Sequence, residues 1–283
     1  MKKSLAILIA LCLMMVSNAF AFELTRDITV VSREDGSGTR GAFIELMGIE
    51  KKDENGDKMD YTSEEAIITN NTNVMMTTVA GDDHAIGYCS LGSLNDSVKA
   101  LQVDGVVPSA EAIEAGTYGV ARPFNIATFG EINEVSADFI SYMLSTEGQK
   151  IVAENGYIAL SDTESYAGKQ VTGKIVVSGS SSISPIMEKL KEAYVVINPS
   201  ASIEIQTSDS TTGMNNASQG LCDIGMASRG LKQSELDAGL APTVLAMDGI
   251  AIIVNNNNTI DTLSKDAIAK IFMGETLTWD VAK

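Results

Sequence analysis

The chain has 283 residues, of which 45% are hydrophobic, so it can form one two-lobed unit or two ordinary domains and is not wholly disordered. Acidic residues number 37 and basic residues 20, for a formal net charge of -17, so nucleic acid is repelled and is not expected as a partner. A single histidine, His84, and three cysteines exclude a histidine-rich metal centre and a zinc finger.

The first residues have the form of an export signal. Met1-Lys2-Lys3 is followed by an apolar run over Leu5–Val16 and then by Ala19-Phe20-Ala21, which matches a signal-peptidase site. The apolar run is too short to span a bilayer. We therefore predict that residues 1–21 are a signal peptide cleaved after Ala21, and that the protein is periplasmic or secreted.

Predicted strands and helices alternate along the rest of the chain. The predicted strands are Ile28–Ser32, Lys174–Ser178, Ser202–Gln206, Asp223–Ala227 and Thr243–Val254, the last broken at Asp248-Gly249. One helix is predicted to begin near Gly41, a second to follow an N-cap at Ser184, and a short third to end near Gly220. Three more predicted helices cover Ser136–Leu144, Thr146–Ala153 and Ser264–Phe272. This alternation predicts an α/β fold with mainly parallel or mixed sheets.

Two cysteines remain after the predicted cleavage. Cys89 and Cys222 both lie in apolar, strand-like surroundings. Export would permit a disulfide, but nothing in the sequence places the two residues together. Two small buried core residues are therefore the favoured interpretation.

Three loops share one pattern, because each follows a strand, is rich in Ser, Thr and Gly, and precedes a helix. They are Asp35–Arg40, Gly179–Ser182 and Asp209–Gly213. A helix N-terminus offers unpaired N–H groups, hydroxyls add donors, and glycine allows close approach of the backbone. The three loops together indicate an oxyanion-binding site.

Two other motifs are weaker. The glycines of Gly36–Gly41 match the dinucleotide fingerprint, but no strand ending in an acid follows at the required distance. Residues Asp53–Glu64 resemble a calcium loop, but Lys58 stands where the turn needs glycine. A solvated charged loop is favoured there, and we expect no metal and no cofactor.

Several segments resemble one family. Val31–Arg40 is similar to the hallmark segment of the periplasmic phosphate-binding proteins of ABC transporters, the PstS family. Further similar segments are Ala85–Tyr88, Glu147–Val152, Gly173–Pro185, Asp223–Arg229 and Ala246–Val254. Their order departs from the family, because the half that opens the family's domain comes second here. The chain therefore resembles a circular permutant, although a piece of tandem copies would have the same order.

The resemblance implies a two-lobed periplasmic-binding-protein fold of type II, with mixed sheets flanked by helices and the ligand in a cleft between the lobes. One lobe is expected to contain residues 22–90 and 249–283, with Arg33 and the Gly-Ser-Gly-Thr loop. The other is expected to contain residues 91–248, with the Gly179–Ser182 loop and Asp223.

The resemblance also implies roles for single residues. Arg33 would bind phosphate oxygens and Asp35 would hold Arg33 in place. The other implied phosphate ligands are Ser37, Gly38, Thr39, Ser181, Ser182, the Ile183 N–H, Ser210 and Asp223. A carboxylate such as that of Asp223 only accepts hydrogen bonds, so it would favour a protonated phosphate over sulfate.

The function that follows from the resemblance is capture of inorganic phosphate by a monomer and its delivery to the membrane permease of an ABC importer. No nucleophile is placed beside a base in the sequence, so no catalysis is expected. The alternatives are a binding protein for another oxyanion such as sulfate or molybdate, a phosphate sensor, and, least favoured, a secreted phosphoester hydrolase that would depend on His84.

Overall fold

The computed structural model describes residues 22–282. The predicted signal peptide, residues 1–21, lies outside the described residues. Within residues 22–282, none of the helices has the length and apolar character that a bilayer crossing requires.

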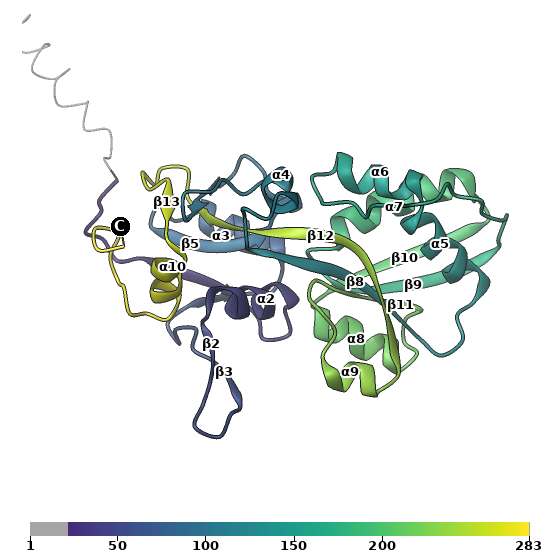
Figure 1. Ribbon diagram of the computed structural model, residues 1–283, viewed down its shortest axis with the longest axis horizontal. Coiled ribbons are helices and arrows are strands. Elements are labelled where there is room, and N and C mark those ends of the chain that lie inside the picture. Colours follow the sequence, from purple (N-terminus) through teal and green to yellow (C-terminus); the bar gives the residue numbers. More distant parts are fainter. Residues whose placement is uncertain (1–21, 283) are drawn as a thin grey trace, which may run out of the picture.

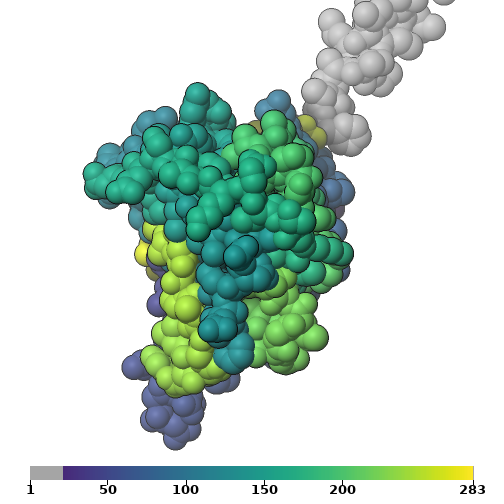
Figure 2. Space-filling view, turned by 90° about the vertical axis from the view of Figure 1, so that its right-hand side faces the viewer, coloured from purple at the N-terminus to yellow at the C-terminus, as the bar shows by residue number. Residues whose placement is uncertain are grey.

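A nine-stranded sheet runs through the molecule in the order β10-β9-β11-β8-β12-β5-β1-β4, with β6 added beside β12. Its strands are β1 (Thr29–Arg33), β4 (Ile67–Thr69), β5 (Ala85–Ser90), β6 (Lys99–Ala100), β8 (Ala121–Phe129), β9 (Gly173–Ser180), β10 (Ala201–Ser208), β11 (Ile224–Ala227) and β12 (Leu240–Val254). Two small sheets pair β2 (Glu50–Lys52) with β3 (Lys58–Asp60), and β7 (Gln102–Val103) with β13 (Thr262–Leu263). The β2–β3 hairpin projects from the body as a narrow arm (Figures 1 and 2).

Helices flank this sheet at both ends (Figure 1). They are α2 (Gly38–Met47), α3 (Thr72–Ala80), α4 (Ala110–Glu114), α5 (Glu134–Leu144), α6 (Thr146–Glu154), α7 (Ser184–Ile197), α8 (Ser210–Ser218), α9 (Gln233–Asp237) and α10 (Lys265–Phe272). In the right-hand part of Figure 1, α5, α6 and α7 lie on one side of the strands and α8 and α9 on the other. The predicted α/β class with mixed sheets is confirmed.

Two main hydrophobic cores divide the chain into two lobes. The first core contains residues of α2, α3, β5 and α10, and the second contains residues of α5, α7, β9 and β11. Residues of 98–120, such as Val98 and Tyr118, pack into the first core. The predicted boundary at residue 91 is therefore wrong: the first lobe contains residues 22–120 and 250–282, and the second contains residues 121–249.

Local chemistry places most elements where the sequence predicts them, with three differences. Helix α2 begins at Gly38 rather than near Gly41, because Ser37 caps it and accepts a hydrogen bond from the Arg40 N–H at 3.3 Å. Ser184 is the first residue of α7 and not its N-cap, since its hydroxyl donates to the Ser180 carbonyl instead. Strand β12 is unbroken at Asp248-Gly249, where it changes partner from β8 to β5.

The strands β8 and β12 cross between the lobes, and a buried ion pair lies on them. Arg122 and Asp248 face each other across the two strands, with Arg122 Nη2 3.1 Å from Asp248 Oδ2. The other carboxylate oxygen of Asp248 accepts from the Ser90 hydroxyl at 2.9 Å, which ties β12 to the first lobe. Burial raises the pKa of Asp248, and the nearby Arg122 guanidinium opposes that rise.

The two ends of the described chain lie side by side in the first lobe. The Ile28 N–H donates to the Leu277 carbonyl at 2.7 Å, and the Phe22 ring packs edge-on against Trp279. A circular permutant is expected to have such neighbouring ends, because they arise where a once continuous segment was cut.

The two cysteines are both buried and unpaired, as the sequence favoured. Cys89 belongs to the first core, while Cys222 lies in a small cluster beneath α8. Burial raises the pKa of the Cys89 thiol to about 12 and that of Cys222 to about 11, so both thiols stay protonated.

Asp248→Asn leaves Arg122 as an uncompensated buried charge. We expect the free energy of unfolding to fall by about 3–5 kcal/mol, measured by urea denaturation. The control is Glu154→Gln, which removes an exposed pair with Lys150 and is expected to change stability by less than about 1 kcal/mol. Equal losses in the two variants would contradict the structural role of the buried pair.

Candidate functional site

The carboxyl ends of parallel strands from both lobes point into the space between the lobes. In the first lobe β1 and β4 run parallel and end level with each other at Arg33 and Thr69. In the second lobe β9 and β10 run parallel and end at Ser180 and Ser208. Helices α2, α3, α7 and α8 start a few residues beyond these strand ends. Four helix N-termini therefore face one cleft, the position where α/β folds bind ligands and where anions are favoured.

Arg33 is a buried cation of the cleft. Its guanidinium forms two 2.7 Å hydrogen bonds to Glu34, and its Nη2 also donates to the Ser181 hydroxyl of the other lobe at 3.2 Å. The Arg33 N–H donates to the Tyr88 hydroxyl at 3.1 Å, and burial raises the pKa of Tyr88 to about 12, so that hydroxyl remains protonated. These contacts fix both the backbone and the charged group of Arg33.

Asp35 does not hold Arg33, so that prediction is wrong. Its side chain is 95% exposed and pairs with Arg40 at 2.8 Å. Glu34 takes the predicted role, because its two carboxylate oxygens accept from Arg33, whereas the exposed Asp35 pairs with Arg40.

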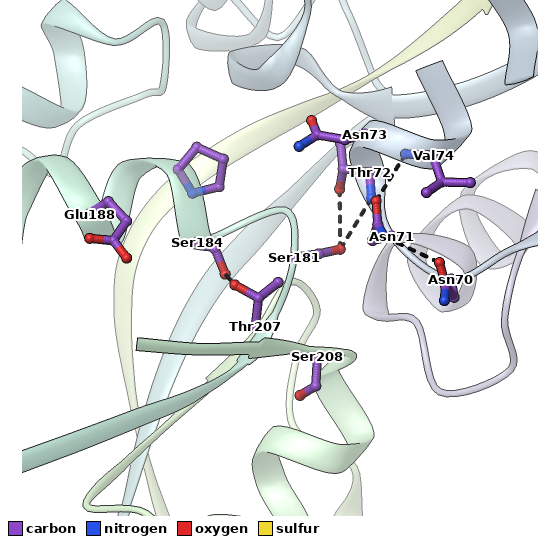
Figure 3. Close-up of a pocket in the computed structure, with 11 residues that line it drawn as sticks. Asn70, Asn71, Thr72, Asn73, Val74, Ser181, Ser184, Glu188, Thr207 and Ser208 are labelled. Atoms are coloured by element: carbon purple, nitrogen blue, oxygen red, sulfur yellow. Dashed lines mark hydrogen bonds between the residues drawn. The ribbon is translucent and has the colours of Figure 1, made fainter. Parts of the chain in front are cut away.

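Hydroxyl groups from both lobes meet beside Arg33. Thr39 of α2 lies 2.8 Å from Ser182, and Thr72 at the start of α3 lies 3.2 Å from Ser182 and 3.3 Å from Ser181. The Thr72 N–H also donates to Ser181, as the dashed lines in Figure 3 show. The lobes are therefore closed on each other through hydroxyl contacts.

A second set of close contacts involves Gly38. A Cβ atom at Gly38 would collide with the hydroxyl of Ser210 and lie 2.9 Å from that of Ser228. These two serines share a 3.4 Å hydrogen bond, and the Ser228 N–H donates to Ser210 at 3.1 Å. Only glycine lets the α2 N-terminus approach the second lobe so closely. Thr39, Thr72, Ser181, Ser182, Ser210 and Ser228 are called the hydroxyl cluster below.

Two predicted ligands do not belong to this arrangement. The Ile183 N–H already donates to the Ser180 carbonyl at 3.0 Å, so it is not offered to the cleft. Asp223 precedes β11 and lies level with Val176, at the far end of the sheet from the cleft. It is separated from Ser228 by five residues of strand, or about 16 Å, and its other oxygen accepts from Asn133 at 2.7 Å. Asp223 is therefore not a cleft aspartate.

The sequence prediction placed Arg33, Ser37, Gly38, Thr39, Ser181, Ser182 and Ser210 at the cleft, and the structure brings these residues together. It missed Glu34, Thr72 and Ser228. A signal for Thr72 existed, because Asn70-Asn71-Thr72 is also a polar segment between a strand and a helix. Ser228 follows the buried strand β11 in the same way.

A pocket of about 680 Å³ opens beside the hydroxyl cluster. Its walls come from the start of α3 in the first lobe and from α7 and the end of β10 in the second (Figure 3). Ser181 lies between these walls in the close-up, where it contacts Thr72. The pocket is therefore the mouth of the cleft, and the Ser181–Thr72 contact forms part of its wall.

Comparison with known proteins agrees with this architecture. A family model described as the PBP superfamily domain matches residues 16–147 and 164–282. The chain is 52% identical over 258 residues to the phosphate-binding protein PstS 2 of Streptococcus agalactiae, an alignment that covers 90% of this chain and 88% of that protein. It also resembles a crystal structure of a phosphate-binding protein of a phosphate ABC transporter from Streptococcus pneumoniae, with TM-score 0.71, 43% identity, and coverage of 91% of this chain and 100% of that one.

The fold and the interlobe cleft thus define a two-lobed protein of the PBP superfamily. Within that superfamily, the chain belongs to the PstS family of phosphate-binding proteins.

The order of segments is shared with the streptococcal relative, because one continuous alignment covers nearly all of both chains. The phosphate-binding protein PstS of Bacillus subtilis instead matches over 150 residues, at 34% identity, covering 50% of this chain and 46% of that protein. A sequential alignment can follow only one half of a permuted chain, so a half-length match fits the predicted permutation.

Gly38→Ala tests the close approach of the two lobes. The new Cβ meets Ser210 and Ser228, so closure is hindered while the backbone conformation remains acceptable for alanine. Overpacking raises the free energy of the closed form by about 1–3 kcal/mol. The affinity for phosphate ions, measured by calorimetry, should therefore fall roughly 5- to 150-fold.

The matched control is Gly41→Ala in the same helix, where the nearest atom to a new Cβ is Arg229 Cδ at 3.9 Å. This variant should retain affinity, and both variants should remain as stable to heat as the parent. If the two substitutions reduce affinity equally, interlobe contact at Gly38 is not what limits binding.

Proposed function

We propose that this chain is an extracytoplasmic solute-binding protein that captures inorganic phosphate in the cleft and delivers it to the membrane permease of an ABC importer. The names of its relatives support phosphate as the ligand, since both are called phosphate-binding proteins. In this proposal the chain is exported, its signal peptide is cleaved after Ala21, and it works as a monomer.

The observation that carries the proposal is the convergence of hydrogen-bond donors from both lobes. Arg33 supplies the charge, the N–H groups of Gly38 and Thr39 lie in the first turn of α2 without intrahelical acceptors, and the hydroxyl cluster adds donors around them. Ser37 supports the same turn as the cap of α2. Positive charge, helix N-termini and hydroxyls together suit a small tetrahedral anion.

Binding proceeds by closure of the lobes around the anion. The anion takes the place of hydroxyl–hydroxyl contacts such as Thr39–Ser182. Each such contact contributes only about 0.5–1.5 kcal/mol net, so an anion that accepts from both lobes at once stabilises the closed form more. Bending at β8 and β12 opens the cleft again.

The protein acts in this proposal without catalysis. Its single histidine, His84, directly precedes β5, which runs parallel to β1, and pairs through its carbonyl with Thr29 at the start of β1. His84 therefore lies at the opposite end of the sheet from Arg33, where its ring stacks on Phe22. A histidine there is not placed to activate a cleft hydroxyl, which disfavours the hydrolase alternative. Another oxyanion as ligand, and a sensor role without transport, are the competing possibilities.

Arg33→Gln tests the charge at the centre of the site. Removal of a buried, hydrogen-bonded charge partner weakens binding by about 2–5 kcal/mol, so phosphate affinity should fall by at least about 30-fold in a calorimetric titration.

The matched control is Arg26→Gln, which makes the same charge change at an exposed position outside the cleft. It should bind phosphate as the parent does. A parent protein that is folded and does not bind phosphate would sink the proposal, and equal losses in the two variants would remove Arg33 from the site.

A further inference from the structure

We propose that the cleft recognises the charge and shape of a tetrahedral oxyanion without detecting its proton, so that sulfate binds with an affinity close to that of phosphate. This inference deepens the proposed function and rests on the same cleft. It departs from the sequence-based expectation, in which Asp223 separates phosphate from sulfate.

The carboxylates around the cleft already have hydrogen-bond or ion-pair partners. Both oxygens of Glu34 bind Arg33, and both oxygens of Asp209 bind Thr212 through its N–H and its hydroxyl. Glu188 at the cleft mouth pairs with Lys191. Among residues 22–282, the hydrogen bonds of the hydroxyl cluster reach other hydroxyls, N–H groups and Arg33, and include no carboxylate.

The position that a cleft carboxylate would occupy is held by other groups. β11 points its carboxyl end at the cleft, and the residues there are Ser228 and Arg229. Ser228 joins the hydroxyl cluster through Ser210. The Arg229 guanidinium binds Glu235 at 2.7 and 2.8 Å, so this carboxylate too already has a partner.

Hydroxyl groups respond to a ligand proton differently from carboxylates. A serine or threonine hydroxyl both donates and accepts, and its hydrogen rotates to suit its partner. In the Thr39–Ser182 and Thr72–Ser182 contacts either oxygen can be the donor. Such a cluster can accept from the P–OH of a protonated phosphate and can equally donate to every oxygen of sulfate.

The size of the expected discrimination follows from this difference. When a buried group can only accept hydrogen bonds, its lone pairs face those of an unprotonated ligand such as sulfate. Unpaired polar groups of this kind lower the affinity for that ligand by about 10⁴- to 10⁵-fold. A cluster of rotatable hydroxyls forms its hydrogen bonds with either anion. Phosphate and sulfate affinities should therefore differ by less than about a hundredfold.

The experiment is calorimetric titration of the purified, phosphate-free protein with sodium phosphate and, separately, sodium sulfate. The titrations are made both below and above the second ionisation of phosphate. A sulfate dissociation constant within about a hundredfold of that for phosphate at both pH values supports the inference, and a larger ratio at either pH overturns it.

The same titrations separate this inference from the proposed function. Tight phosphate binding with sulfate excluded leaves the proposed function intact and overturns the inference. Sulfate binding without phosphate binding overturns the proposed function, and it overturns the inference as well, because the two affinities then differ by far more than about a hundredfold. Binding of neither anion by a folded protein overturns both.

Two sets of variants locate the source of selectivity. Asp223→Asn should leave the phosphate-to-sulfate ratio unchanged, because Asp223 lies at the far end of β11; a changed ratio overturns the inference. Ser228→Asp places an acceptor-only group at the cleft end of the strand and should lower sulfate affinity at least about tenfold more than phosphate affinity. Its neutral match, Ser228→Asn, should weaken both anions alike, and thermal unfolding confirms that each variant is folded.

Discussion

A desolvated anion needs hydrogen-bond donors on every side, and this requirement shapes the whole molecule. One sheet edge with its helix N-termini can cover only one side of a ligand. The second side comes from another lobe whose parallel strands point the opposite way, so that α2 and α3 face α7 and α8 across the cleft. Gly38 allows the backbones of the two lobes to approach within contact of Ser210 and Ser228. A single lobe of this chain would present the same loops without being able to enclose an anion.

The lobes must also separate, and the crossing strands β8 and β12 allow both closure around the anion and separation. β12 pairs with β8 in the second lobe and with β5 in the first, so one strand belongs to both lobes. The Arg122–Asp248 pair is buried where the partner changes and anchors β12 to Ser90 of the first lobe. Most contacts that close the cleft join single hydroxyls or one backbone pair, such as the Thr211 N–H to the Gly36 carbonyl. A firm crossing point with weak closing contacts suits a protein whose ligand decides between open and closed forms.

The sequence was informative wherever function depends on local structure. The loops before α2 and α8 are short segments whose Gly, Ser and Thr content follows from capping and close approach, and they were predicted at the right positions. The cleft role of Asp223 was implied by the family resemblance, and it is wrong for a different reason. Its strand was predicted, but which end of that strand reaches the cleft depends on its pairing with β9, a tertiary property that the residues alone do not reveal. Likewise, Glu34 and Asp35 are adjacent acids, and only the path of the turn decides which of them faces Arg33.

The charge of the protein is consistent with a cleft whose hydroxyl cluster, among residues 22–282, has no carboxylate partner. With a net charge of -17 the chain does not attract anions from a distance, although surface charges are screened beyond about 8 Å at physiological ionic strength. Inside the cleft, Glu34 already balances Arg33, so the site begins close to neutral. A further carboxylate there would make the site negative, and its repulsion would have to be overcome by the helix dipoles and hydroxyls that bind the anion. Rotatable hydroxyls avoid that repulsion, because they add donors without adding charge.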